Sequence, residues 1–328
     1  MTTREAHVER IMSPYAGEVP GAALLILKDG EPVVRKGYGL ANLEERTPVT
    51  AQTNFRLASL TKQFTAACIL LLVEEGKVGL ADPVRRWFPS LPDAANGITV
   101  RHLLTHTSGL IDYEDVIPAT LSRQLRDADV LQLLEHQDRT YFVPGTAYRY
   151  SNSAYALLAL LVERASGKTF AAFLRERIFQ PLKMTGTVAH EEGISHVAHR
   201  AFGYSEEHGR WIRTDQSQTS AVLGTAGVYA SLDDLAKWDA ALYDERLLKA
   251  HSLRLAFAAA TATDDPAIAY GMGWRISGET LWHSGETQGF RNVIVRFPAR
   301  RLTVVMLTNR NDPEPYRAAL AAVRPYLS

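Results

Sequence analysis

The sequence predicts an α+β protein in which one antiparallel sheet is built from both ends of the chain. Apolar, β-rich segments occur near the N-terminus and again in the last quarter, and helical periodicity dominates between about residues 80 and 250. Strands at both ends with helices between them imply a helical region inserted into a single sheet. We expect a sheet region of residues 1–58 and 255–328 and a mostly helical region of residues 59–254.

The N-terminal part is expected to form a short helix followed by a hairpin. Residues 1–15 have the pattern of a short helix. The chain is apolar and β-rich from Ala22 to Lys28, Asp29-Gly30 is a strong hairpin signal, and Val33–Leu40 returns as the partner strand.

The helical part begins with a segment that is apolar on every face. Ala66 to Val73 carries no polar side, so we expect a helix buried all round and ended by Gly76. This segment is shorter than the roughly 20 apolar residues that span a bilayer. Further helices are predicted at residues 103–110, 128–136, 153–165, from Thr169 and from Ser231.

The C-terminal part returns to strands. We expect four of them, at residues 270–276, 279–284, 290–297 and 302–309. Asp312-Pro313 is expected to start a final helix that reaches toward Tyr326.

Composition excludes several classes of function. Of the 328 residues, 46% are hydrophobic and 22% charged, as in ordinary globular proteins. Lys plus Arg and Asp plus Glu number 36 each, so we expect no nucleic-acid or membrane partner. The single cysteine, Cys68, excludes an intramolecular disulfide. The charged N-terminus lacks an apolar signal segment, from which we expect a cytoplasmic protein.

Ser59 and Lys62 stand three residues apart at the start of the buried helix. This spacing places both side chains on one face, where a lysine of lowered pKa can take the proton of a serine nucleophile. The backbone N–H groups at a helix start also favour negative charge on a reacting oxygen. The alternative is a capping serine and a solvated lysine, and this pair alone does not decide between them.

Tyr150 and Asn152 follow a Pro-Gly turn and precede a helix. A phenol near a lysine cation is biased toward phenolate and can act as a general base. Asn152 offers an amide to a substrate carbonyl or to Lys62. The alternative is a packed tyrosine and a capping asparagine.

A third stretch, His283-Ser284-Gly285-Glu286, lies on a predicted strand. Gly285 would let a ligand approach an edge strand, so the backbone N–H of Glu286 would be the second oxyanion donor beside that of Ser59. His283 would supply a cation or a proton shuttle, or else be a hydrogen-bonded structural histidine.

In order along the chain, these three motifs resemble those of the serine β-lactamase and penicillin-binding-protein superfamily, written S-x-x-K, S-D-N and K-T-G. The tyrosine of the middle motif is similar to the class C branch, with its D,D-peptidases, D-aminopeptidases and esterases. Residues 103–110, 178–182 and 224–231 also resemble segments of that branch. The resemblance covers roughly Pro20 to Asn309.

The resemblance implies a sheet flanked by terminal helices beside a helical region, with the site in the cleft between them. It implies that Ser59 is the nucleophile, that Lys62 and Tyr150 share acid and base work, and that Asn152 positions the substrate. Ser284, Gly285 and Glu286 would contribute to substrate binding and the oxyanion site. His283 takes the place of the lysine of the third motif, so weak or no β-lactamase activity is expected. No metal or organic cofactor is implied.

Two competing motifs are rejected. Gly167-Lys168-Thr169 resembles a phosphate-binding loop, but Val162 stands where the first glycine belongs. His102 and His106 have the spacing of a zinc pair, yet Leu103 replaces the required glutamate.

The sequence thus predicts a serine hydrolase that forms an acyl-enzyme on Ser59. We expect a small-molecule or short-peptide ester or amide as substrate, typical of an esterase or a D-amino-acid amidase or peptidase. The alternative is a non-catalytic binding or scaffold protein of the same fold. The sequence leaves the oligomeric state open.

Overall fold

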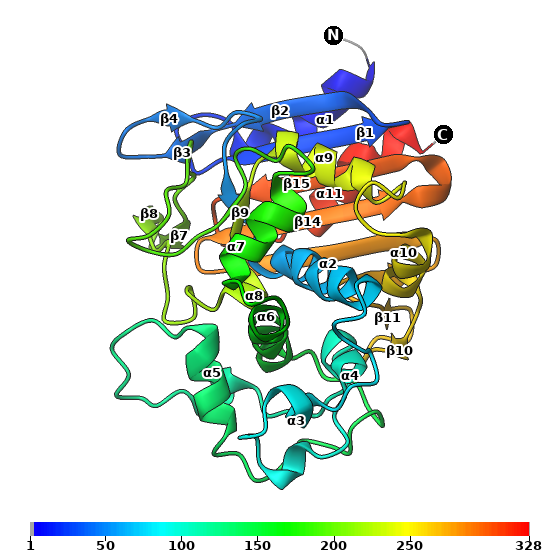
Figure 1. The fold of residues 1–328 in the computed structure, drawn as a ribbon. Coiled ribbons are helices and arrows are strands. Elements are labelled where there is room, and N and C mark those ends of the chain that lie inside the picture. The colour runs from blue at the N-terminus through cyan, green and yellow to red at the C-terminus, as the bar shows by residue number, and fades with distance from the viewer. Residues whose placement is uncertain (1–2, 328) are drawn as a thin grey trace.

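The computed structural model describes residues 3–327 and is dominated by one eight-stranded antiparallel sheet (Figure 1). Strand β1 pairs with β15, so strands from the two ends of the chain lie side by side in the sheet. The prediction of a sheet formed from both ends is therefore confirmed. In spatial order the strands are β10 (Thr261–Ala262), β11 (Ala269–Tyr270), β12 (Arg275–Ser277), β13 (Thr280–Thr287), β14 (Phe290–Phe297), β15 (Leu302–Thr308), β1 (Ala22–Lys28) and β2 (Glu31–Tyr38).

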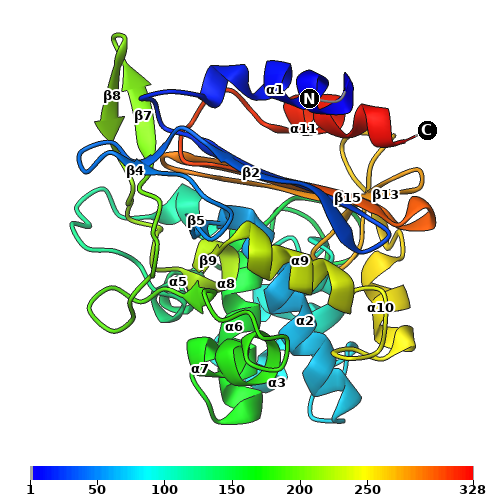
Figure 2. The same cartoon turned by 90° about the horizontal axis from the view of Figure 1, so that it is seen from above.

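Helices cover both faces of this sheet (Figure 2). Helices α1 (Thr3–Met12) and α11 (Tyr316–Val323) pack on the outer face, and α9 (Leu232–Ala241) packs on the inner one. β1 is apolar from Ala22 to Leu27 because Leu24 and Ile26 face the outer core, while Leu25 and Leu27 face the inner one. The flanking terminal helices agree with the predicted architecture.

The helical region is centred on α2 (Thr61–Glu74), which is buried from Thr61 through Leu72 as its apolar pattern predicts. Helix α6 (Asn152–Ser166) packs against α2. The remaining helices are α3 (Val84–Trp87), α4 (Val100–Leu104), α5 (Asp127–Leu134), α7 (Phe170–Leu174), α8 (Leu223–Ala226) and α10 (Ala250–Phe257). None of the described helices is long and apolar enough to cross a membrane.

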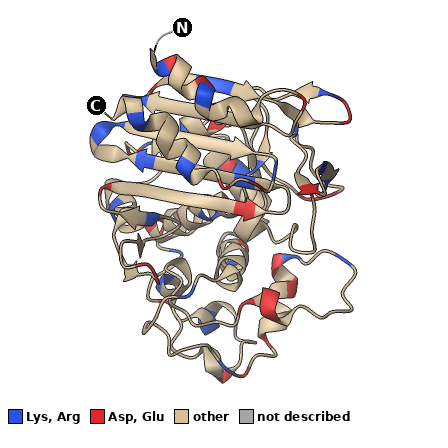
Figure 3. Ribbon diagram, turned by 180° about the vertical axis from the view of Figure 1, so that it is seen from behind, with Lys and Arg blue, Asp and Glu red and all other residues tan. Residues whose placement is uncertain are grey.

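Small sheets and short helical turns connect these elements. The small sheets pair β3 (Leu40–Asn42) with β4 (Thr47–Pro48), β9 (Val228–Ala230) with both β5 (Phe55–Arg56) and β6 (Val188–Ala189), and β7 (Tyr204–Glu207) with β8 (Arg210–Arg213). Residues of both charge signs occur in both regions of the molecule, and acidic residues gather on α5 (Figure 3).

Three predicted boundaries are wrong. The strand predicted at residues 270–276 is two strands, because the chain turns between Tyr270 and Arg275, with Gly273 at φ +79°. The helix predicted at residues 103–110 covers Val100–Leu104 and stops before His106, whose φ is +58°. The final helix begins at Tyr316, after the Asp312-Pro313 turn.

Candidate active site

Ser59 lies in a single 3-10 turn, Ala58–Leu60, that leads directly into α2. Ala58 has φ +51°, a conformation that costs an L-residue free energy and is often found at functional sites. Lys62 stands in the first turn of α2, and its Nζ is 3.1 Å from Ser59 Oγ. The predicted neighbourhood of these two side chains is therefore present.

Lys62 is fully buried. Its Nζ also donates to Asn152 Oδ1 at 2.9 Å and to the carbonyl oxygen of Thr225 at 3.3 Å. Burial lowers the pKa of Lys62 to about 7, although the carboxylates of Asp112 and Glu114 act in the opposite direction. Near neutral pH a substantial fraction of Lys62 is an uncharged amine, which can accept the serine proton.

Tyr150 lies on the other side of Lys62, whose Nζ sits over the phenol ring at 4.8 Å from its centroid. The phenol oxygen is buried and makes no hydrogen bond to the described residues. Burial raises the pKa of Tyr150, although the nearby Ser59 and Arg275 oppose this. The expected bias toward phenolate is wrong, because the lysine faces the ring and the loss of hydration dominates.

Asn152 begins α6 and holds Lys62, as one of its predicted roles required. Its Nδ2 donates to Glu114 Oε1 at 2.9 Å, and its backbone N–H donates to Asp112 Oδ2 at 2.8 Å. Burial raises the pKa of Glu114. This acidic pair was not found in the sequence, because its distance from Asn152 along the chain hides the contact.

His283 is buried on β13 and hydrogen-bonded at both ring nitrogens. Nδ1 is 2.6 Å from the carbonyl oxygen of Ser284, so it carries the proton, and Nε2 accepts from the Tyr270 hydroxyl at 3.0 Å. Burial, together with the charge of Arg275, lowers the pKa of His283 well below its ordinary value. The expected cation is therefore wrong, and the hydrogen-bonded histidine is observed.

Gly285 faces the turn that carries Ser59. A Cβ atom there would lie 2.1 Å from Leu57 O and 3.2 Å from Ser59 N. The close approach predicted for a ligand is thus made by the nucleophile turn itself. The side chain of Glu286 is exposed and pairs with Arg291 at 2.7 Å, so only its backbone is available to an oxyanion site.

β13 pairs with β14 along its length, but with β12 only through Thr280–Trp282. Within the described residues, no strand pairs with it on the β12 side from His283 onward. The part of β13 that contains Gly285 is therefore an edge of the sheet, as expected, although the start of the strand is not. The backbone of Ser284, Gly285 and Glu286 therefore borders the turn of Ser59 where the sheet meets the helical region.

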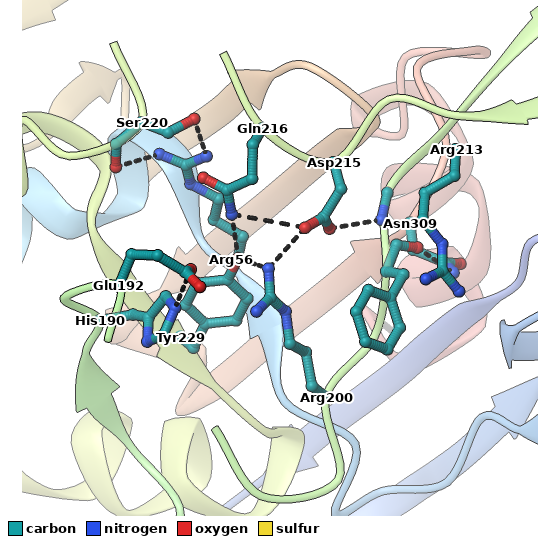
Figure 4. A network of polar contacts seen from close by, with 12 residues as sticks. Arg56, His190, Glu192, Arg200, Arg213, Asp215, Gln216, Ser220, Tyr229 and Asn309 are labelled. Carbon is teal, nitrogen blue, oxygen red and sulfur yellow. Dashed lines mark hydrogen bonds and ion pairs between the residues drawn. The ribbon is translucent and has the colours of Figure 1, made fainter. Parts of the chain in front are cut away.

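Arg56 fixes the segment that leads into Ser59 (Figure 4). Its guanidinium donates to Ser220 Oγ at 2.6 Å and Ser220 O at 2.7 Å, and its Nε donates to Ala226 O at 3.3 Å. It makes no ion pair within residues 3–327, and burial lowers its pKa. Figure 4 shows Asp215 turned instead toward Arg200. Arg56 thereby joins the strand before the nucleophile to both ends of the segment that contains α8.

Comparisons with known proteins agree with this fold. The Beta-lactamase family matches residues 5–326. Penicillin-binding protein 4* of Bacillus subtilis strain 168 is 32% identical over 316 residues, covering 90% of this chain and 70% of the relative. D-aminopeptidase of Gluconobacter oxydans strain 621H is 30% identical over 312 residues, covering 93% of this chain and 58% of the relative.

A solved structure gives the same result. D-amino acid amidase from Ochrobactrum anthropi SV3, complexed with L-phenylalanine amide, matches with a TM-score of 0.86 and 25% identity over 100% of both chains. The fold and these relatives define the protein as a serine hydrolase. The chain belongs to the Beta-lactamase family.

Proposed function

We propose that the protein hydrolyses an amide or ester through an acyl-enzyme on Ser59, as a member of the class C branch. The distance of 3.1 Å between Ser59 Oγ and Lys62 Nζ carries the proposal, because it joins a hydroxyl to a buried amine. Neutral Lys62 takes the hydroxyl proton as Oγ attacks the substrate carbonyl. The backbone N–H groups of Ser59 and Glu286 stabilise the oxyanion.

The leaving group departs with a proton supplied by the Lys62 ammonium or the neutral Tyr150 phenol. Water then attacks the acyl-enzyme and gives its proton to whichever of these two groups has lost one. The Lys62 ammonium returns a proton to Ser59 Oγ as the acid departs. Asn152 keeps Lys62 in place through both steps, since its Oδ1 accepts from Nζ.

The charges around the site favour an amino-acid amide or short peptide. Glu114 and Asp112 surround Asn152 and complement a free α-amino group. The Arg275 guanidinium lies 5.6 Å from the Tyr150 ring centroid and has no ion-pair partner among the described residues, so it complements a carboxylate or carbonyl. The printed names of the D-aminopeptidase and the D-amino acid amidase support a D-amino-acid substrate. Neutral His283, in place of a lysine, supports weak or no β-lactam turnover.

The test is turnover by wild type and Ser59→Ala of D-alanine amide, its N-acetyl derivative and its L-isomer. p-Nitrophenyl acetate and a chromogenic cephalosporin complete the panel. We expect the free D-amide to be preferred and all turnover to vanish in the variant. Absence of both turnover and covalent labelling of Ser59 by a fluorophosphonate would contradict the proposal and favour a binding or scaffold role.

A further inference from the structure

The α8 turn supplies one of the three oxygen partners of Lys62, the carbonyl oxygen of Thr225. The turn is also fastened to α2 one helical turn beyond the lysine, because Thr65 Oγ1 donates to the carbonyl oxygen of Gly224 at 2.8 Å. The position of α8 therefore determines one side of the lysine pocket.

Asp127, the first residue of α5, holds the other side of this turn. Its Oδ2 accepts from the backbone N–H of Leu223 at 2.9 Å, and its Oδ1 accepts from that of Gly224 at 3.1 Å. Gly224 has no room for a side chain, since a Cβ atom would lie 2.4 Å from Tyr155 O. The carboxylate and the start of α8 thus fit directly against each other.

We propose that Asp127 is a positioning residue for Lys62, acting through the α8 turn rather than by contact with the reacting groups. Both carboxylate oxygens accept hydrogen bonds from backbone amides of α8 and hold this turn in place. The carbonyl oxygen of Thr225 then stays within hydrogen-bond distance of the Lys62 amine. The inference rests on the proposed role of Lys62 as the base.

Ionised Asp127 offers a strong acceptor oxygen to each amide, whereas protonation makes one of these oxygens a hydroxyl, which is a weaker acceptor and carries a donor of its own. Burial raises the pKa of Asp127 to about 7, against the opposing effect of the two amide bonds. Asp127 also lines a cavity of about 650 Å³.

The charged surroundings of Asp127 come from several elements. Glu163 on α6 further raises the pKa of Asp127. Arg123 is bound to Asp129, which leaves Arg126 as the other nearby cation. The remaining titratable groups that face the cavity or interact with Asp127 are His190, Glu191, Glu192 and Tyr113.

The reaction then depends on two deprotonations in the same pH range. Lys62 must be neutral to accept the serine proton, and Asp127 must be ionised to seat α8, so both changes favour turnover as pH rises. Below both pKa values, log kcat/KM should rise with a slope of about two. A single ionisation would give a slope of about one.

The experiment compares Asp127→Asn with Asp129→Asn. Asp129 is a matched control, because it lies in the same first turn and lines the same cavity but contacts Arg123 and the backbone of Arg126 instead of α8. For Asp127→Asn we expect kcat to fall about 10- to 100-fold, with KM little changed and the slope reduced to about one. Asp129→Asn should keep the wild-type slope.

Two further measurements keep the test decisive. Thr65→Val removes the other bond to α8 and should lower kcat in the same direction if Asp127→Asn does not fold. The pH dependence of Ser59 labelling by a fluorophosphonate needs no substrate. Wild-type protein that does not label would contradict the proposed function. Labelling with equal slopes in wild type and Asp127→Asn would overturn the role of Asp127 alone.

Discussion

Two buried bases border the site, Lys62 on α2 in its helical wall and His283 on β13 in its sheet wall. Burial lowers the pKa of both, but the groups that oppose this effect differ. Lys62 donates to three oxygen atoms, and burial lowers its pKa to about 7 against the opposing charges of Asp112 and Glu114. His283 on β13 has one nitrogen occupied by a carbonyl and the other by a hydroxyl donor, and its pKa falls well below the ordinary value.

This difference gives the two walls of the site different roles. Burial removes the hydration of both bases. The carboxylates of Asp112 and Glu114 favour the protonated form of Lys62, whereas for His283 the charge of Arg275 adds to the effect of burial and only the Ser284 carbonyl opposes it. The helical wall can therefore exchange protons near neutral pH. The sheet wall keeps one fixed protonation state and presents backbone beside the Ser59 turn.

Replacing Lys62 with Met should give the largest effect. It removes the base but keeps a buried chain of similar length, so we expect kcat/KM to fall about 10²- to 10⁴-fold without loss of the fold. In wild type, kcat/KM should rise as pH increases through about 7, because the neutral amine is the active form. Steady-state kinetics measured from about pH 5 to about pH 9 would check both the fall in kcat/KM of the variant and the pH dependence of the wild type.

The control is Lys36→Met, which alters an exposed lysine paired with Glu9 on the far side of the sheet. It should leave the kinetics unchanged. A Lys62→Met enzyme that keeps most of its activity would show that Tyr150 acts as the base.

Gly285→Ala should give the next largest effect, because the added methyl group on β13 would clash with the turn that carries Ser59. Its Cβ would meet Leu57 O at 2.1 Å, so the Ser59 turn must shift. We expect a loss of about 10²-fold in kcat and about 1–3 kcal/mol in the free energy of unfolding. Kinetics and urea denaturation measure the two losses.

Gly278→Ala, on the same hairpin, is the matched control. That glycine has φ +56° but nothing within 4 Å of an added Cβ. It should lose some stability and no activity. Equal activity losses in the two variants would contradict the role given to the contact at Gly285.

His283→Gln should give the smallest effect. Since His283 is neutral, the amide can keep a donor and an acceptor, and we expect kcat/KM to change by less than about tenfold. The midpoint of the pH profile should stay the same. A shifted midpoint, measured by the same kinetics, would mean that His283 does carry a proton during turnover.

Local patterns predicted most of the fold and the main pair of the site. β1 runs from Ala22 to Lys28 as expected, and the three-residue spacing of Ser59 and Lys62 is enough to bring them together. The split between Tyr270 and Arg275 could not be foreseen, because it depends on Gly273 lying against the backbone of α2.

Protonation states were harder to predict than positions. The sequence correctly predicted that Lys62 and Tyr150 lie close together. It did not predict that the amine lies over the ring, where it leaves the buried phenol neutral. The sequence also did not reveal the two residues that hold the site in place, because their contacts are made between distant parts of the chain. Arg56 and Asp127 act on backbone groups that lie 164 and 97 residues away in the chain, and no spacing rule reports such contacts.

The pairing of β1 with β15 has a consequence for the protein during its synthesis. The backbone N–H of Gly21, just before β1, bonds to Asn309, which follows 288 residues later. At about 5–20 residues per second, the ribosome needs roughly 15–60 s to make that stretch. Until β15 is made, one edge of the N-terminal hairpin is unpaired, and β13, which borders the Ser59 turn, is itself made only near the end of this time. The nascent chain therefore carries Ser59, the proposed nucleophile, well before the site is complete, and must be kept from pairing that edge with a neighbour.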